Sequence, residues 1–119
     1  MLGLSFSEIA IYLLVVTHIT IVSVTVYLHR FSAHRSLLLN APISHFFRFW
    51  LWLTTGQVTR EWTAVHRKHH AECETTEDPH SPVRQGLTTI LWEGVETYKS
   101  AIADQETLRR YGRGCPDDW

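Results

Sequence analysis

The chain has 119 residues and a formal net charge of -1, and 45% of its residues are hydrophobic. This composition lacks the basic excess of a nucleic-acid-binding protein and any acidic tail, so no nucleic-acid partner is expected. The length fits one small domain. Cys73 and Cys115 stand far apart, which argues against a disulfide framework, a zinc ribbon or a C-x-x-C redox pair, and we interpret them as reduced thiols.

The first apolar segment runs over residues 9–28 and contains no charged side chain. At about 1.5 Å per residue, a helix of that length spans roughly 30 Å of hydrocarbon. Ser5, three residues before Glu8, forms a capping-box pattern at its entrance. We predict a transmembrane helix over about 9–28. A cleaved signal peptide is the alternative, but the segment has neither a basic n-region nor a small-residue cleavage site.

Charge along the chain predicts the orientation of this helix. All eleven Lys and Arg residues follow position 29. Because such residues stay on the cytoplasmic side, we expect the N-terminus outside and the chain from His29 onward in the cytoplasm.

The next apolar segment, about 43–58, is rich in aromatic residues, with Asn40 as a plausible cap and Pro42 in its first turn. Arg48 lies near its middle and would cost at least about 3 kcal/mol at the centre of a bilayer. We therefore predict an interfacial amphipathic helix that stays on the cytoplasmic side. The alternative is a second, tilted span in which Arg48 is paired.

The second half of the chain predicts two more helices. One covers about 59–71, a polar loop with Pro79 and Pro82 follows, and an amphipathic helix covers about 87–103. The end of the chain, 111–119, reads as a turn. The predicted fold class is all-α: an integral-membrane helical protein with one transmembrane helix followed by interfacial amphipathic helices.

Three histidines of the helix at 59–71 form the strongest motif. His66, His69 and His70 are spaced i, i+3 and i+4, so their rings fall within a sector of about 100° on one helix face. Neutral imidazole is a good ligand for iron, zinc, copper and nickel. The pattern predicts metal ligation, and the alternative is an ordinary basic helix face.

A second pair, His29 and His34, follows the apolar segment directly. A spacing of five places the rings about 140° apart on an ideal α-helix, so the pair would not bind one ion in the simplest way. The two could serve neighbouring ions, or the helix could unwind at the membrane boundary. Two surface histidines near an interface are the other interpretation.

Three neighbours of the second cluster are candidates for substrate contact. Trp62 shares a helix face with His66, where it would pack beside the metal or the substrate chain, or serve as a core residue. Arg67 and Lys68 point away from the histidine face, which suits contact with anionic lipid or coenzyme A phosphates. A solvated basic face is the alternative for both.

Polar residues of the transmembrane segment predict helix packing. They are His18, Thr17, Thr20, Ser23 and Thr25. We interpret them as a seam that packs against another helix by interhelical hydrogen bonds. A role in a substrate channel is the alternative.

Three motifs together resemble the membrane fatty acid desaturases, most closely their acyl-CoA desaturase branch. They are YLHRFSAHR (27–35), EWTAVHRKHH (61–70) and EDPHS (77–81). The resemblance implies a non-haem centre of two iron ions that uses dioxygen and two external electrons to remove two hydrogens from an acyl chain. It implies iron ligation by His29, His34, His66, His69 and His70.

The chain departs from this family at its end. Members carry a third cluster, H-x-x-H-H, and eight or more ligands, so we expect a truncated chain that cannot hold the full centre alone. The substrate would be a long-chain acyl-CoA or lipid. Electrons would come from a separate reductase, ferredoxin or cytochrome, because no flavin, nicotinamide or iron-sulfur motif is present. The alternatives are a hydroxylase of the same superfamily and a non-catalytic membrane protein that binds zinc or haem.

Overall fold

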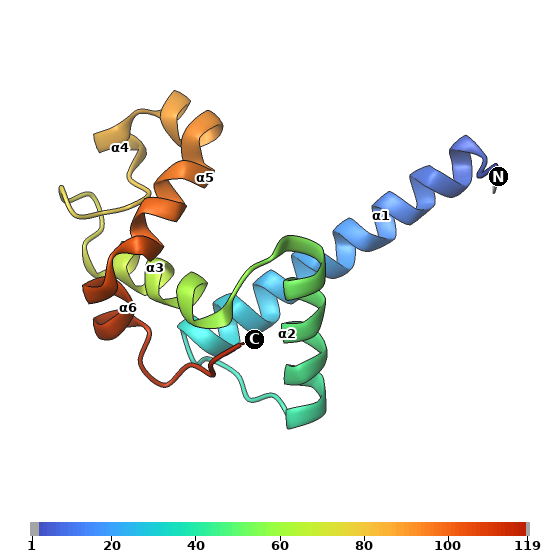
Figure 1. The fold of residues 1–119 in the computed structure, drawn as a ribbon, viewed down its shortest axis with the longest axis horizontal. Helices are drawn as coiled ribbons and strands as arrows, with labels where there is room; N and C mark the ends of the chain where they lie inside the picture. Colours follow the sequence, from blue (N-terminus) through green and yellow to red (C-terminus); the bar gives the residue numbers. More distant parts are fainter. Residues whose placement is uncertain (1–2, 119) are drawn as a thin grey trace.

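The computed structural model describes residues 3–118, and every regular element in that range is a helix (Figure 1). The all-α prediction is therefore confirmed. The elements in chain order are α1 (Phe6–Ser23), the π-helix η1 (Val24–Ala33), α2 (Ala41–Thr55), α3 (Thr59–Ala71), α4 (Pro82–Gln85), α5 (Leu87–Ala103) and α6 (Gln105–Tyr111).

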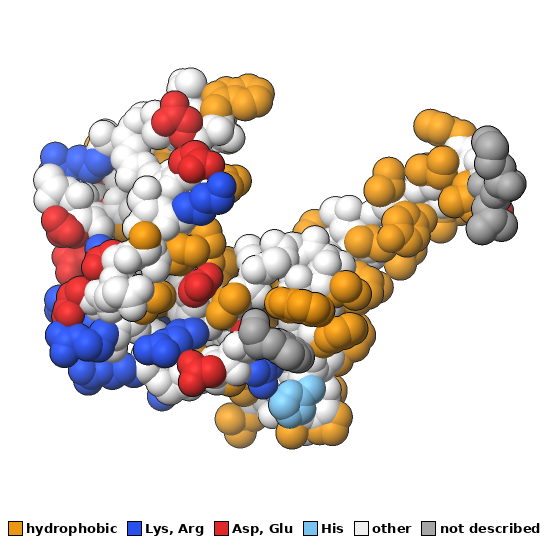
Figure 2. All heavy atoms as spheres, in the orientation of Figure 1, with side chains coloured by type: hydrophobic (Ala, Val, Ile, Leu, Met, Phe, Trp, Pro, Cys, Tyr) orange, Lys and Arg blue, Asp and Glu red, His pale blue; other side chains and the backbone are white. Residues whose placement is uncertain are grey.

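Helices α1 and η1 form one continuous rod of 28 residues, Phe6–Ala33. It is the one helix in the described range that is long and apolar enough to cross a membrane, judged by length and composition. The predicted capping box closes its N-terminus: Glu8 N–H donates to Ser5 Oγ (3.3 Å), and Ser5 N–H donates to Glu8 Oε2 (2.8 Å). α1 projects from the rest of the molecule as an arm with an apolar surface (Figures 1 and 2).

Helix α2 begins and ends at clear signals. Asn40 Oδ1 accepts from Ile43 N–H (3.1 Å) at its start, and Gly56, at φ 67°, ends it in the left-handed region that favours glycine. With 15 residues it is shorter than the roughly 20 that a span requires. Arg48 pairs with Asp118 at 2.6 Å, and the two side chains are only 15% and 2% exposed. Arg48, which would be costly to place unpaired at the centre of a bilayer, thus has an ionic partner in Asp118.

The core lies where η1, α2 and α3 meet. Tyr27 and Leu28 of η1 and Leu51 of α2 are each 1% exposed, and Trp62 of α3 packs against them. Tyr27 stacks on Phe31 with ring centroids 5.6 Å apart. This packing fixes the histidine-bearing end of η1 against its neighbours, and we call it the junction.

Buried hydroxyls join η1 to α3 inside the junction. Tyr27 OH lies 3.2 Å from Thr59 Oγ1, and Ser32 Oγ lies 2.8 Å from Thr63 Oγ1. Because each buried hydroxyl finds a partner on the other helix, these contacts set the register of the two helices as well as their separation.

The polar seam of the arm makes an interhelical bond through Thr20. Its Oγ1 accepts from Trp50 Nε1–H on α2 at 3.0 Å. Ser23 instead donates back to Ile19 O in its own helix (2.7 Å). The packing interpretation of the seam is therefore confirmed at Thr20.

Helices α5 and α6 pack over α3 (Figure 1). α5 has the bounds that its sequence pattern indicates, 87–103, whereas α6 was not predicted. Asp104 caps α6 by accepting from Glu106 N–H (3.0 Å). The last residues described, up to Asp118, return to the junction, where Asp118 Oδ2 accepts from Thr59 N–H (2.6 Å).

Candidate metal centre

The π-helix η1 decides where the first two histidines point. In a π-helix the backbone bonds run from residue i to i+5, and His34 N–H donates to His29 O at 3.0 Å. Residue i+5 therefore lies over residue i. The rings of His29 and His34 meet with Nε2 atoms 3.1 Å apart. The expected 140° separation is wrong because it assumed an α-helix. The looser π-winding brings the two rings together while the helix stays continuous.

Helix α3 brings two further histidines to the same place. His66 and His70 lie one turn apart with Nε2 atoms 3.1 Å apart, and His66 Nε2 is 3.4 Å from His34 Nε2. The ring centroids of His29 and His66 are 4.8 Å apart. All four candidate ligand atoms lie within 4.8 Å of one another, and we call this group the histidine cluster.

The spacing of the histidine cluster fits a bound ion. An imidazole nitrogen lies about 2.1 Å from a metal such as zinc, so two nitrogens on one ion at right-angled or tetrahedral geometry are about 3.0 to 3.4 Å apart. Three Nε2–Nε2 distances fall in this range: His29 to His34, His34 to His66, and His66 to His70. The donor set is all nitrogen, which suits iron, zinc or copper.

Electrostatics keep this cluster able to bind a cation. Burial, followed by the neighbouring imidazoles of His70, His29 and His34, lowers the pKa of His66 to about 4. Burial and the same kind of neighbour also lower the pKa of His34. Both rings are therefore neutral near pH 7, and a neutral imidazole is the form that ligates a metal.

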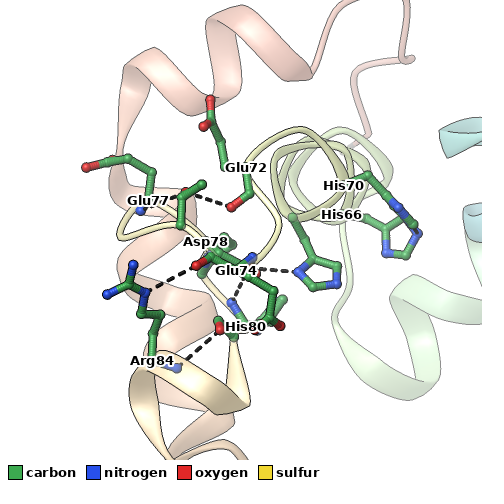
Figure 3. Close-up of polar contacts among 12 residues, drawn as sticks. His66, His70, Glu72, Glu74, Glu77, Asp78, His80 and Arg84 are labelled. Atoms are coloured by element: carbon green, nitrogen blue, oxygen red, sulfur yellow. Dashed lines mark hydrogen bonds and ion pairs between the residues drawn. The ribbon is translucent and has the colours of Figure 1, made fainter.

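The fifth predicted ligand, His69, faces another group. Its Nδ1 lies 2.7 Å from Asp78 Oδ1, and His69, Cys73 and Asp78 form a second set of candidate ligand atoms within 4.8 Å. In Figure 3, His66 and His70 lie on the side of α3 away from the loop that carries Asp78. The three histidines of α3 thus do not all converge on one point.

Trp62 and Tyr98 enclose a small space beside the cluster. Trp62 stacks on His66 with ring centroids 4.6 Å apart and an angle of 15°. A cavity of about 150 Å³ is lined by Trp62, Val65, His66, His80 and Tyr98. The buried Tyr98 hydroxyl has no hydrogen-bond partner among the described residues, and burial raises its pKa. Sequence reasoning missed Tyr98, because a Tyr on an amphipathic helix carries no signal of its own.

Arg67 holds the two histidine-bearing elements together. Its guanidinium donates to four backbone carbonyls: Ser32 (2.8 Å) and Ala33 (3.3 Å) at the end of η1, and Tyr111 and Arg113 (both 2.9 Å) near the end of the chain. The last carbonyls of a helix lack hydrogen-bond donors within that helix, and Arg67 supplies donors to the carbonyls of Ser32 and Ala33.

Lys68 also has partners within the chain. Its Nζ donates to Thr107 Oγ1 at 3.1 Å and lies 3.7 Å from Asp104 and 3.9 Å from Glu77. The side chain is 15% exposed. Both predicted phosphate-binding residues are thus engaged between α3 and neighbouring segments, and their predicted contact with substrate stays a prediction.

Within residues 3–118, fold and site together define a helical protein with one candidate membrane helix and a histidine cluster at the end of that helix. The chain belongs to the fatty acid desaturase family, whose sequence profile matches residues 7–110. The resemblance carried by the three motifs is therefore confirmed at the level of the family.

Curated relatives from Arabidopsis thaliana agree with this assignment. The protein named Probable lipid desaturase ADS3.2, chloroplastic, is 36% identical over 63 residues, covering 53% of this chain and 18% of the relative. Delta-9 acyl-lipid desaturase 1 is 34% identical over 71 residues, covering 58% of this chain and 23% of the relative. The chain thus matches about a fifth of the length of these relatives. No solved structure matches it.

Proposed function

We propose that this chain supplies ligands to a histidine-bound di-iron centre in an enzyme that desaturates a long-chain fatty acyl group with dioxygen. The observation that carries the proposal is the convergence of four imidazoles, two from η1 and two from α3, at ligand-to-ligand spacing. Membership of the desaturase family and the desaturase names of the relatives support the reaction class.

In this proposal His29, His34, His66, His69 and His70 hold iron, and further ligands come from parts of the complete protein outside this chain. When bound, the irons would supply the oxidising chemistry that removes two hydrogens from an unactivated acyl chain. The residues of this chain position the metals and limit the access of water. Trp62, stacked on His66, forms one wall of the space beside the cluster.

The substrate and the membrane arrangement are parts of the same proposal. An acyl-CoA or acyl-lipid would approach from the bilayer, with the histidine cluster at the cytoplasmic end of the rod and the N-terminus outside. A separate reductase, ferredoxin or cytochrome would deliver the electrons. Arg67 and Lys68 are proposed to contact phosphate groups of the substrate or lipid. To do so, each side chain would give up a hydrogen bond that it makes within the chain.

The test uses the complete protein that contains this chain, purified in lipid with a reduced electron donor, dioxygen and long-chain acyl substrates. We expect two irons per protein and an unsaturated product by mass spectrometry, and we expect His66→Ala to abolish both the iron and the product. A hydroxylated product would assign the protein to the hydroxylase alternative. A single zinc or a haem Soret band, without product, would refute the proposal.

A further inference from the structure

The carboxylate of Asp78 is buried and fully engaged. Its side chain is 0% exposed, and it accepts from the backbone N–H groups of Glu74 and His80, each at 2.9 Å. Its third contact is His69 Nδ1 at 2.7 Å. Figure 3 shows Asp78 on the loop that follows α3, beside the helix. A buried anion with three donors is a fixed point in this part of the structure.

Hydrogen bonds of the surrounding loop hold the Asp78 carboxylate in place. Gln85 Nε2 donates to the carbonyls of Asp78 (3.4 Å) and Pro79 (3.2 Å), and Arg84 Nε donates to Glu74 O (3.1 Å). These bonds position the backbone on both sides of the carboxylate. The carboxylate therefore constrains the His69 ring, which is 28% exposed and the less buried partner of the two.

The contact with Asp78 determines which nitrogen of His69 carries a proton. An ionised carboxylate only accepts hydrogen bonds, so at 2.7 Å the Nδ1 atom must be the donor. In the neutral ring Nε2 then has the free lone pair.

We propose that Asp78 is a positioning residue that fixes His69 in the Nδ1–H tautomer and aims its Nε2 lone pair for a metal ion. The metal part of this inference rests on the proposed function, whereas the tautomer part does not. The competing explanation is that Asp78 only closes the loop, with His69 as an incidental neighbour.

The first experiment reads the tautomer without metal or activity. The 119-residue chain, labelled with ¹⁵N at histidine and placed in lipid nanodiscs, is studied by long-range ¹H–¹⁵N correlation NMR near neutral pH. We expect His69 in the Nδ1–H form in the unmodified chain and a shift toward Nε2–H in Asp78→Asn. An Nε2–H ring at His69 in the unmodified chain would overturn the inference, and this result needs no variant to fold.

The second experiment measures Co²⁺ binding to the same chain by its absorption spectrum. Loss of an outer-shell partner typically weakens metal binding by about 10- to 100-fold, which is the effect expected for Asp78→Asn. The matched control is Gln85→Leu, which removes two bonds of the loop and leaves the Asp78 contact with His69 intact. A pure loop effect would weaken binding in both variants alike.

A double-mutant cycle separates positioning from loop closure. In a chain that already carries His69→Ala, a positioning residue has nothing left to position, so Asp78→Asn should change Co²⁺ affinity little. An undiminished effect in that background would contradict the inference. If the unmodified chain fails to bind Co²⁺, the metal part of this inference fails for the chain alone, the iron analysis of the complete protein decides the proposed function, and the tautomer measurement still decides the role of Asp78.

Discussion

The arm α1 continues directly into η1, which is one of the three helices of the junction. The arm and the junction are nevertheless stabilised in different ways. On the arm, large apolar side chains face outward, with Phe6 87% and Leu14 71% exposed. In the junction, Tyr27, Leu28 and Leu51 are 1% exposed. An apolar surface of this kind, seen on the arm in Figure 2, is typical of contact with lipid or with another protein surface, whereas the junction makes its own core.

The winding of the helix changes at the same boundary. The arm is α-helical to Ser23, and η1 is π-wound from Val24 to the histidines. π-Helical turns are rare in proteins, and those that occur often lie at functional sites. The comparison therefore indicates that the arm is the candidate membrane segment and that the junction builds the site. The following variants test the contacts of the junction and then the contact of the arm with it.

The largest expected effect is on metal binding. His66→Ala removes the imidazole that lies between His34 and His70, so Co²⁺ affinity should fall by more than about 100-fold, beyond the loss of an outer-shell partner. The matched control is His18→Ala on the arm, which should leave binding unchanged. Equal losses in both would contradict the location of the site. Titration followed by absorption measures both.

The next effect is on packing. Leu51→Ala leaves a cavity in the junction core and should lower the free energy of unfolding by about 2 to 5 kcal/mol. Leu53→Ala, two residues along the same helix and 60% exposed, should change it by only about 0.5 kcal/mol. Unfolding in mixed micelles, followed by circular dichroism, provides the measurement. A larger loss at Leu53 would place the core on the other face of α2.

A smaller effect is expected from Arg67→Lys. Lysine keeps the charge but lacks the planar fork that reaches four carbonyls, so the free energy of unfolding should fall by about 1 to 3 kcal/mol. Arg109→Lys is the control, because Arg109 makes an exposed pair with Glu106 within α6. The same micelle unfolding assay applies, and equal stability of the two variants would remove Arg67 as a link between η1 and α3.

The smallest effect tests the contact between the arm and α2. Thr20→Val removes the acceptor of the Trp50 N–H and should cost about 0.6 kcal/mol, the average for such bonds between membrane helices. Thr17→Val, at an exposed position of the arm, is the control. Trp50 fluorescence during unfolding reports on this contact. A loss as large as that of Leu51→Ala would mean that the arm is held by packing after all.

The sequence predicted the elements well where local signals are strong. The apolar run, the Ser5 capping box and the Asn40 cap located the first two long helices to within a few residues, and the histidine spacing located α3. It missed α4, which lies in the predicted loop, and α6, because helices of four and seven residues have too little periodic pattern. α6 also depends on packing against α3.

The sequence alone also determined the chemistry available to the site, since residue type fixes which side chains can ligate a metal. Only the tertiary structure decided how they are arranged. The π-winding of η1 brings His29 and His34 together, and His69, whose Nδ1 contacts Asp78, lies outside the group formed by those two with His66 and His70. Both arrangements depend on contacts between segments that are separated along the chain. A sequence pattern reflects only the preferences of neighbouring residues, so it does not show these contacts.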